Sequence, residues 1–249
     1  MKNYKGQERL NLSNLPKASE LPRQESLYYT SNPRFYVAVD CIIFGYFDGH
    51  LKVLLQKRDF EPFSGEMSVQ GGFVQEGEDI DEAALRVLCE RTGIRQVGIT
   101  QVGAFGEVDR DPGARVISIA YTCLIDSNMC DEEVVEQHHG QWADIDALPP
   151  LHFGHGEMVR QALSQLRGNM GRKPVCFHLL PPLFTLTQMQ KVYEAVLGEK
   201  LDKRNFRKRI ADMPFIEKTM LIDKKHSKRG AVYYMYNEDR FKLINKFKV

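Results

Sequence analysis

The sequence predicts an α+β protein with two ordered domains, and three observations support this. Hydrophobic residues make up 43% of the 249 positions, enough for a sizeable core. Up to about residue 167, β-branched and aromatic runs alternate with helical segments, which is typical of a mixed sheet covered by helices. From residue 187 the pattern changes to two helices and a hairpin. We therefore expect a polar, flexible tail over 1–32, a mixed-sheet α/β/α sandwich over 33–170 and a smaller domain over 171–249.

The elements of the larger domain follow from local pattern. Extended, β-branched segments predict strands at 35–44, 51–56, 97–105 and 115–125, and a shorter one within 142–148. Asp48-Gly49 is typical of a hairpin turn between the first two strands. Apolar residues recur at helical spacing over 79–92, and Gly93 follows where a C-cap belongs. A second amphipathic helix is expected over 156–167.

Composition excludes several classes of protein. No run of about 18 apolar residues is present, which excludes a transmembrane helix. The first 25 residues lack an apolar signal core, so we expect no export. The number of cysteines is odd, and no pair has C-x-x-C spacing, which argues against a zinc site or a disulfide framework. We therefore expect a reduced, cytoplasmic setting for the five thiols of Cys41, Cys89, Cys123, Cys130 and Cys176.

The net charge of +1 conceals an asymmetry between the two parts of the chain. From Lys173 onward there are 17 Lys/Arg and 8 Asp/Glu, a net charge of +9, whereas residues 1–172 have 17 against 25, a net charge of −8. A basic C-terminal part indicates a polyanionic partner, most often nucleic acid. On charge alone, a solvated basic surface is an equally good explanation.

The smaller domain has the pattern of a helix-turn-helix. Thr187 and Gln190 fit a capping box, and an apolar stripe at i, i+3, i+4 and i+7 begins at Met189. Asp202 is a good N-cap for a second helix. Phe206 is expected on the buried face of that helix, and most of its other positions are basic.

Two short strands joined by a basic loop follow over 216–236. With the helix pair they predict a winged helix-turn-helix that binds a double-stranded DNA operator. Arg and Asn near the start of the second helix suit guanine and adenine edges, while wing cations suit phosphate. The expected DNA-binding residues are Lys203, Arg204, Asn205, Arg207, Lys208, Lys224, Lys225, Lys228 and Arg229.

The segment from Gly72 to Ile94 resembles the Nudix box, G-x5-E-x7-R-E-U-x-E-E-x-G-U, in which U is a bulky apolar residue. Seven of its nine constrained positions match, which makes an ordinary capped helix a poor alternative. The residues singled out in this box are Gly72, Glu78, Arg86, Val87, Glu90, Arg91 and Gly93.

The departures from the box decide the expected chemistry. The family places metal-binding carboxylates at three positions on one helix face, which here hold Val87, Glu90 and Arg91. Mg²⁺ prefers oxygen ligands, so an apolar side chain and a cation spoil the site. We expect no metal, no cofactor and no catalytic residues. Arg86 is expected to pair with a glutamate in a structural role, and Glu82 stays open as a substitute carboxylate.

The pocket of such a domain can survive without the chemistry. Residues 106–115 form a polar loop between two strands, and Asp-Pro-Gly within it is ordinary turn chemistry. Arg110 and Arg115 are candidates for phosphate or sugar oxygens, so the expected effector-binding residues are Asp40, Gln56, Arg110, Arg115 and Tyr121. His138 and His139 lack a third ligand and are expected at the surface.

A degenerate Nudix domain followed by a winged helix resembles the bacterial Nudix-related transcriptional regulators over residues 35–249. The run from Phe184 to Lys208 is similar to the DNA-binding module of that family. The resemblance implies an effector-sensing Nudix domain and a homodimer that binds an operator. The implied effectors are ADP-ribose-like metabolites or sugars such as arabinose. The chain resembles the arabinose-type, sugar-utilisation branch most closely.

Two other functions stay open. One is an active Nudix hydrolase of ADP-ribose or another nucleoside diphosphate with an appended nucleic-acid module, which Val87 and Arg91 oppose. The other is a Nudix-fold RNA-binding or scaffold protein without an effector. An effector-dependent change in operator affinity distinguishes a regulator from this second alternative.

Overall fold

The computed structural model describes residues 30–47, 49–95, 97–126, 132–170, 175–225, 227 and 230–246. The chain divides into two units, Met1–Arg34 and Phe35–Val249, and every feature below belongs to the second. The expected tail lies almost wholly outside the described residues. So do Asp48 of the predicted hairpin turn, Lys228 and Arg229 of the predicted wing, and the predicted domain boundary at 171.

A mixed seven-stranded sheet forms the larger part of this unit. The central strand β1 runs parallel to β6, while its pairings with β2 and β4 are antiparallel. The strand order is β3-β2-β1-β6-β5, with β4 also pairing β1 and β7 pairing β2. The strands are β1 (Tyr36–Phe47), β2 (His50–Lys57), β3 (Met67–Ser68), β4 (Gln70–Phe73), β5 (Ile99–Phe105), β6 (Val116–Ile125) and β7 (Gly140–Asp144).

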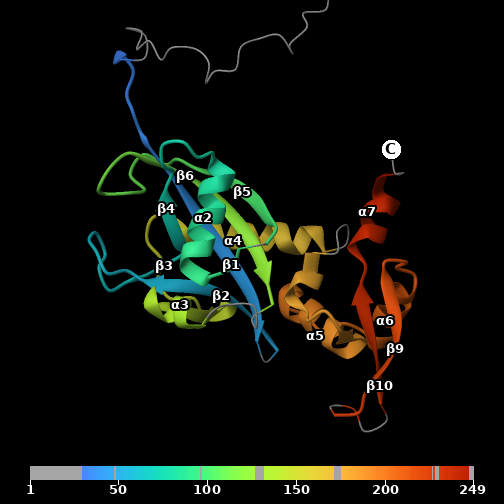
Figure 1. Ribbon diagram of the computed structural model, residues 1–249. Coiled ribbons are helices and arrows are strands. Elements are labelled where there is room, and N and C mark those ends of the chain that lie inside the picture. Colours follow the sequence, from blue (N-terminus) through green and yellow to red (C-terminus); the bar gives the residue numbers. More distant parts are fainter. Residues whose placement is uncertain are drawn as a thin grey trace, which may run out of the picture. The chain divides into compact units, whose positions relative to one another are not determined.

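Alternate residues of β1 pack against helices on opposite faces of the sheet, as the period of a strand requires. Val39, Cys41 and Ile43 share a buried cluster with α2 (Ile80–Thr92). Ile42 and Phe44 belong to a second cluster that contains α4 (His155–Asn169). Figure 1 shows α2 and α4 on either side of the sheet, so the predicted sandwich is confirmed. The short helices α3 (Glu132–Gln137) and η4 (Ile145–Ala147) were not predicted.

The C-terminal part is the predicted winged helix-turn-helix. Helices α5 (Leu186–Leu197) and α6 (Lys203–Ala211) are followed by the wing strands β9 (Ile216–Asp223) and β10 (Ala231–Tyr236). Strand β8 (Phe184–Thr185) completes an antiparallel sheet in the order β8-β10-β9. Two elements were not predicted, the 3-10 helix η5 (Val175–Leu179) and helix α7 (Glu238–Lys246).

The predicted start of α5 is wrong by two residues. Thr185, not Thr187, is the N-cap, and its hydroxyl accepts from the Gln188 amide at 3.2 Å. The Gln188 side chain accepts from the Thr185 amide at 2.8 Å, which completes the capping box. Both Thr-x-x-Gln pairs fit the motif, but Thr185 is the last residue of strand β8 and has the extended backbone that an N-cap needs, whereas Thr187 lies inside the helix. The expected Asp202 N-cap of α6 and Gly93 C-cap of α2 are confirmed.

One hydrophobic cluster runs through both domains. It joins Phe44 of the sheet to Met158 of α4, then to Phe177 of η5 and Phe206 of α6, all buried. The Phe177 ring stacks on Tyr236 of β10 with centroids 4.7 Å apart. Helix α4 therefore contacts both the sheet and the winged helix, and α5 and η5 also contact strands of the sheet directly. Within the described residues, no helix is both long and apolar enough to cross a membrane.

Candidate functional site

The retained part of the Nudix box is a clamp between the loop and α2. Arg86 donates from Nε to Glu78 Oε2 at 2.9 Å and from Nη2 to Glu78 Oε1 at 2.7 Å. The hydrogen bonds from Arg86 and from the Gln75 amide lower the pKa of Glu78 to about 2. Arg86 Nη2 also donates to the Phe73 carbonyl at 3.0 Å. This pairing with a glutamate was expected, and it fixes the turn that leads into the helix.

The three metal positions of the box do not fit a divalent cation. Val87 is buried, and a Cβ on Gly72 would lie 2.8 Å from its Cγ2, so this position belongs to the core. Glu90 faces Arg86 at 3.4 Å, while Glu82 is occupied in the capping box with Asp79. Among the described residues, no group of three His, Cys, Asp or Glu side chains could hold a metal ion.

Arg91 has a partner that the sequence did not predict. Its Nη1 lies 2.7 Å from Nδ1 of His138, which follows α3. Burial and the adjacent guanidinium lower the pKa of His138, which favours the neutral ring that accepts this hydrogen bond. The expectation that both histidines lie at the surface therefore holds for His139, which is exposed, but not for His138, which is half-buried and ties α2 to the segment before β7.

The five predicted effector residues do not gather in one place. The Tyr121 hydroxyl donates to Asp81 at the start of α2. Arg115 donates to the Gly106 and Glu107 carbonyls at 2.7 and 3.0 Å and so closes the base of the 106–115 loop. Gln56 is buried in β2, between Ser68 and Gly140 of the flanking strands. Only Asp40 and Arg110 belong to a common cluster.

That cluster is a buried polar network on the α4 side of the sheet. Asp40 accepts from the Ser118 hydroxyl, and its Oδ1 lies 3.5 Å from His155 Nε2. Burial disfavours the charged carboxylate, but His155, Ser118 and the charge of Arg110 outweigh it, so the pKa of Asp40 is lowered. His155 Nδ1 lies 3.3 Å from Ser68 Oγ. The sequence could not reveal this network, because His155 comes 115 positions after Asp40.

Arg110 connects the 106–115 loop to the start of α4. Its Nη1 donates to the Phe153 carbonyl at 2.6 Å, while its Nε is buried without a hydrogen-bond partner. Gly154, the N-cap of α4, adopts a left-handed φ of 72°, and a Cβ there would lie 3.4 Å from Arg110 Cδ. The left-handed backbone therefore favours glycine at 154, at a point where the Arg110 side chain lies in contact.

The predicted DNA-binding side chains of α6 share one exposed surface. Phe206 and Ile210 face the core, while all the predicted basic and amide residues of the helix are exposed. The backbone N–H of Asn205 donates to Asp202 Oδ1 at 2.8 Å, so the capping hydrogen bond does not use the Asn205 side chain. Lys224 and Lys225 of the wing are exposed as well. We call this surface, Lys203, Arg204, Asn205, Arg207 and Lys208, the basic face.

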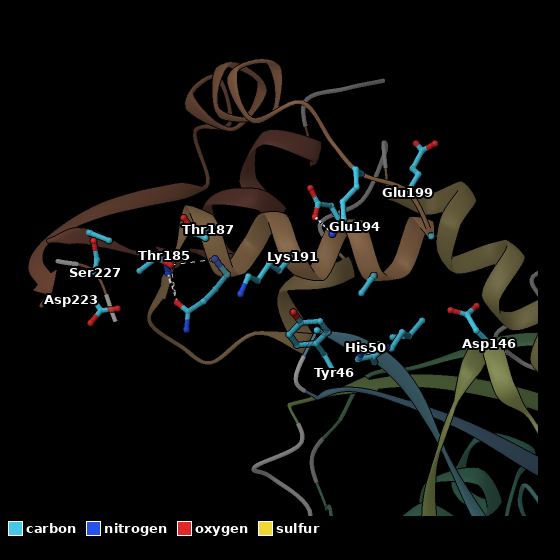
Figure 2. Close-up of a pocket in the computed structure, with 17 residues that line it drawn as sticks. Tyr46, His50, Asp146, Thr185, Thr187, Lys191, Glu194, Glu199, Asp223 and Ser227 are labelled. Atoms are coloured by element: carbon cyan, nitrogen blue, oxygen red, sulfur yellow. Dashed lines mark hydrogen bonds and ion pairs between the residues drawn. The ribbon is translucent and has the colours of Figure 1, made fainter. Parts of the chain in front are cut away.

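The turn between α5 and α6 is held by side chains of α5 and α4. Glu194 accepts from the Leu201 amide at 3.1 Å, and Gln190 donates to the Leu201 carbonyl at 3.0 Å. From α4, Arg167 Nε donates to the Val196 carbonyl at 2.7 Å. A hollow of about 990 Å³ lies beside α5, and Figure 2 shows Lys191 of α5 pointing toward Tyr46, while Glu194 points to the other side of the helix. None of the predicted effector residues lines this hollow.

Comparison with known proteins agrees with this geometry. Residues 34–162 match the NUDIX domain model, and residues 176–236 match the NrtR DNA-binding winged helix domain. The "ADPR responsive transcriptional repressor NtrR" of Acinetobacter baylyi is 31% identical over 191 residues, which cover 75% of this chain and 76% of the relative. An "ADP-ribose pyrophosphatase" of Methanocaldococcus jannaschii is 32% identical over 53% of this chain and 75% of its own length.

Among solved structures, the Shewanella oneidensis NrtR complexed with a 27mer DNA is similar with a TM-score of 0.75. It is 29% identical, and the match covers 82% of this chain and 94% of that one. The match therefore spans the Nudix sandwich and the winged helix together. The chain belongs to the family that joins a Nudix domain to an NrtR-type DNA-binding winged helix domain.

Proposed function

We propose that the protein is a DNA-binding transcriptional repressor whose Nudix domain binds an ADP-ribose-like nucleoside diphosphate without hydrolysing it. The observation that carries this proposal is the exposed basic face of α6 in a winged helix that shares its core with a Nudix domain, where a buried valine, Val87, holds one of the three metal positions. A helix with Arg and Asn near its start suits the major groove, and wing lysines suit phosphate.

The effector class is supported by the relatives. The Acinetobacter repressor and the Methanocaldococcus pyrophosphatase are both named for ADP-ribose, and neither name refers to a sugar. The arabinose-type branch therefore has no support from them. We place the effector against the 106–115 loop, where Arg110 offers a guanidinium of the kind that binds phosphate oxygens.

The first experiment selects duplexes from random-sequence DNA with the wild-type chain and measures their affinity with ADP-ribose, AMP or arabinose present. We expect ADP-ribose to weaken duplex binding and to raise the melting temperature of the free protein, because a ligand that binds only the folded state stabilises it. A response to arabinose alone would overturn the effector class. Preference for RNA over the selected duplexes would support a scaffold or RNA-binding role instead.

A second experiment tests the alternative of an active hydrolase, which the preserved Glu78–Arg86 clamp and the similarity to a pyrophosphatase favour. The protein is incubated with ADP-ribose and Mg²⁺, and released AMP is measured. We expect no turnover at an ordinary enzyme rate of about 1 per second or more. Turnover at that rate would show that other carboxylates supply the metal ligands that Val87 and Arg91 do not.

A further inference from the structure

Helix α4 touches functional elements at both of its ends. At its start, Arg110 of the 106–115 loop donates to the Phe153 carbonyl, and the His155 ring lies against Asp40 of the sheet. At its end, Arg167 donates to the Val196 carbonyl in the last turn of α5. A helix of 15 residues spans about 22 Å. One rigid element therefore joins the proposed effector loop to the helix-turn-helix.

The contact at Arg167 lies where it can set the position of α6. The last carbonyls of a helix have no partner within the helix, and a cation near them is favourable. Arg167 donates a hydrogen bond to the carbonyl of Val196. It also lies close to the end of α5, because a Cβ added to Gly198 would be 3.3 Å from Arg167 Nη2. Four residues further on, Asp202 caps α6. A shift of α4 therefore acts directly on the turn that aims the basic face.

The middle of α4 is packed into the hydrophobic core. Met158, Val159, Ala162 and Leu166 are buried in the cluster that also contains Val192 and Phe206 of the winged helix. Gln165 donates to the Val102 carbonyl of β5 at 2.7 Å. Packed interiors transmit displacements because they lack free space to absorb them. Figure 1 shows α4 leaving the sheet on the side of α5.

We propose that α4 couples the 106–115 loop to the DNA-binding helix α6, with Arg167 as the positioning residue at the DNA-binding end and Arg110 as its counterpart at the loop. This inference rests on the proposed function for the identity of the effector. The mechanical link itself depends only on the contacts of Arg110 and Arg167.

The decisive experiment is a double-mutant cycle that needs no effector. Arg167→Met keeps the aliphatic stem and removes the donors, and Arg110→Met does the same at the loop. Arg160→Met is the matched control, since Arg160 is exposed on the same helix and pairs with Glu157 one turn earlier. The full-length variants are compared for affinity toward a duplex selected by the wild-type chain, after circular dichroism confirms folding. Arg110→Lys replaces Arg110→Met if the latter does not fold.

We expect Arg110→Met to change the dissociation constant of the duplex about threefold or more, and to change it less than about 1.5-fold when Arg167→Met is present. In a chain that also carries Arg160→Met, Arg110→Met should change the dissociation constant of the duplex as much as it does in the wild type. Additive effects of Arg110→Met and Arg167→Met, or no effect of Arg110→Met alone, would overturn the proposal.

A second measurement uses ADP-ribose as the probe. Arg167→Met should bind ADP-ribose within about twofold of wild type, while the ratio of duplex dissociation constants with and without ADP-ribose falls by about threefold or more. Arg167→Lys keeps one donor and should restore the ratio. A purely structural role would lower stability and leave this ratio unchanged. If wild type does not bind ADP-ribose, the proposed effector fails, and the double-mutant cycle still decides the link.

Discussion

Glu78 and Arg86 keep the structural role of the Nudix box, although two of its metal positions no longer hold carboxylates. The bidentate pair holds the loop on α2, as it would in an enzyme, although the neighbouring ligand positions hold Val87 and Arg91. The pair therefore stabilises the turn before α2, whether or not the domain hydrolyses a substrate. Its charge also makes the stability of the protein depend on pH.

The Glu78 pKa lies near 2, below its ordinary value of 4.5, so its contribution to stability is present above pH 4.5 and is lost as the pH falls toward 2. We expect Glu78→Gln to have a lower free energy of unfolding than wild type at pH 7, and a shallower loss of stability between pH 4.5 and 2. Urea denaturation across this range measures both. Glu76→Gln, an exposed carboxylate in the same loop, should retain the wild-type slope.

Restoring carboxylates at the metal positions should fail for a structural reason. Val87 is 1% exposed, and full burial can raise the pKa of a glutamate by up to about 3–5 units, each worth about 1.4 kcal/mol. We expect Val87→Glu to lower the free energy of unfolding at pH 7 by about 4 kcal/mol. Leu85→Glu, at a 38%-exposed position of the same helix, should cost far less.

The measurements are urea denaturation of each variant and of Val87→Glu with Arg91→Glu, with and without Mg²⁺. A well-folded double variant that Mg²⁺ stabilises would show that the pocket still accepts a cation.

At the scale of elements, we predict that the proposed DNA-binding surface divides by role. Arg204 and Asn205 lie in the first turn of α6, exposed and not used in capping, so their side chains are candidates for base edges. Replacing either by alanine should cost about 1–3 kcal/mol of binding and relax the preference at one position of the site. Selection from random DNA with each variant shows the relaxed position. Uniform weakening without relaxed preference would assign the residue to phosphate instead.

The wing should act on affinity and not on sequence preference. Lys224 and Lys225 are exposed where the wing loop begins. Neutralising either to Gln should weaken selected and scrambled duplexes alike, and reduce the slope of log affinity against log salt by about 1. Fluorescence anisotropy over a salt series measures this. Lys191→Gln is the control, since Lys191 faces the hollow beside α5. A changed preference in the wing variants would mean that the wing reads bases.

The elements that the sequence predicted are those with a local signal. The strand at 35–44, the helix at 79–92 and the Asp202 cap rest on periodicity and capping within a few residues, and all are present. Helix α7 was missed although Asn237 accepts from the Arg240 amide and acidic residues follow, which is a start signal. The Asp40–His155 network and the Arg167 contact depend on tertiary packing, so no local pattern could predict them.

At the scale of the whole molecule, each chain has one basic face, and we expect two chains to bind one DNA site together. A two-fold protein recognises a two-fold site, so we predict a homodimer that binds an inverted repeat. Light scattering on a sizing column gives the mass of the free protein and of its complex with a selected duplex. We expect two chains per duplex and a strong loss of affinity when one half-site is scrambled. A single chain bound to a half-site at full affinity would contradict the prediction.

The cluster that joins Phe44, Met158, Phe177 and Phe206 has a practical consequence for protein engineering. Modules that can be cut out and fused to other sensors usually meet across few contacts, in exposed linkers. Here a cut after α4 would leave apolar side chains of α5 and η5 facing water. Transplanting the DNA-binding half therefore requires replacing those side chains with polar ones, because α5 and η5 also contact the sheet and carrying α4 along would cover only part of them.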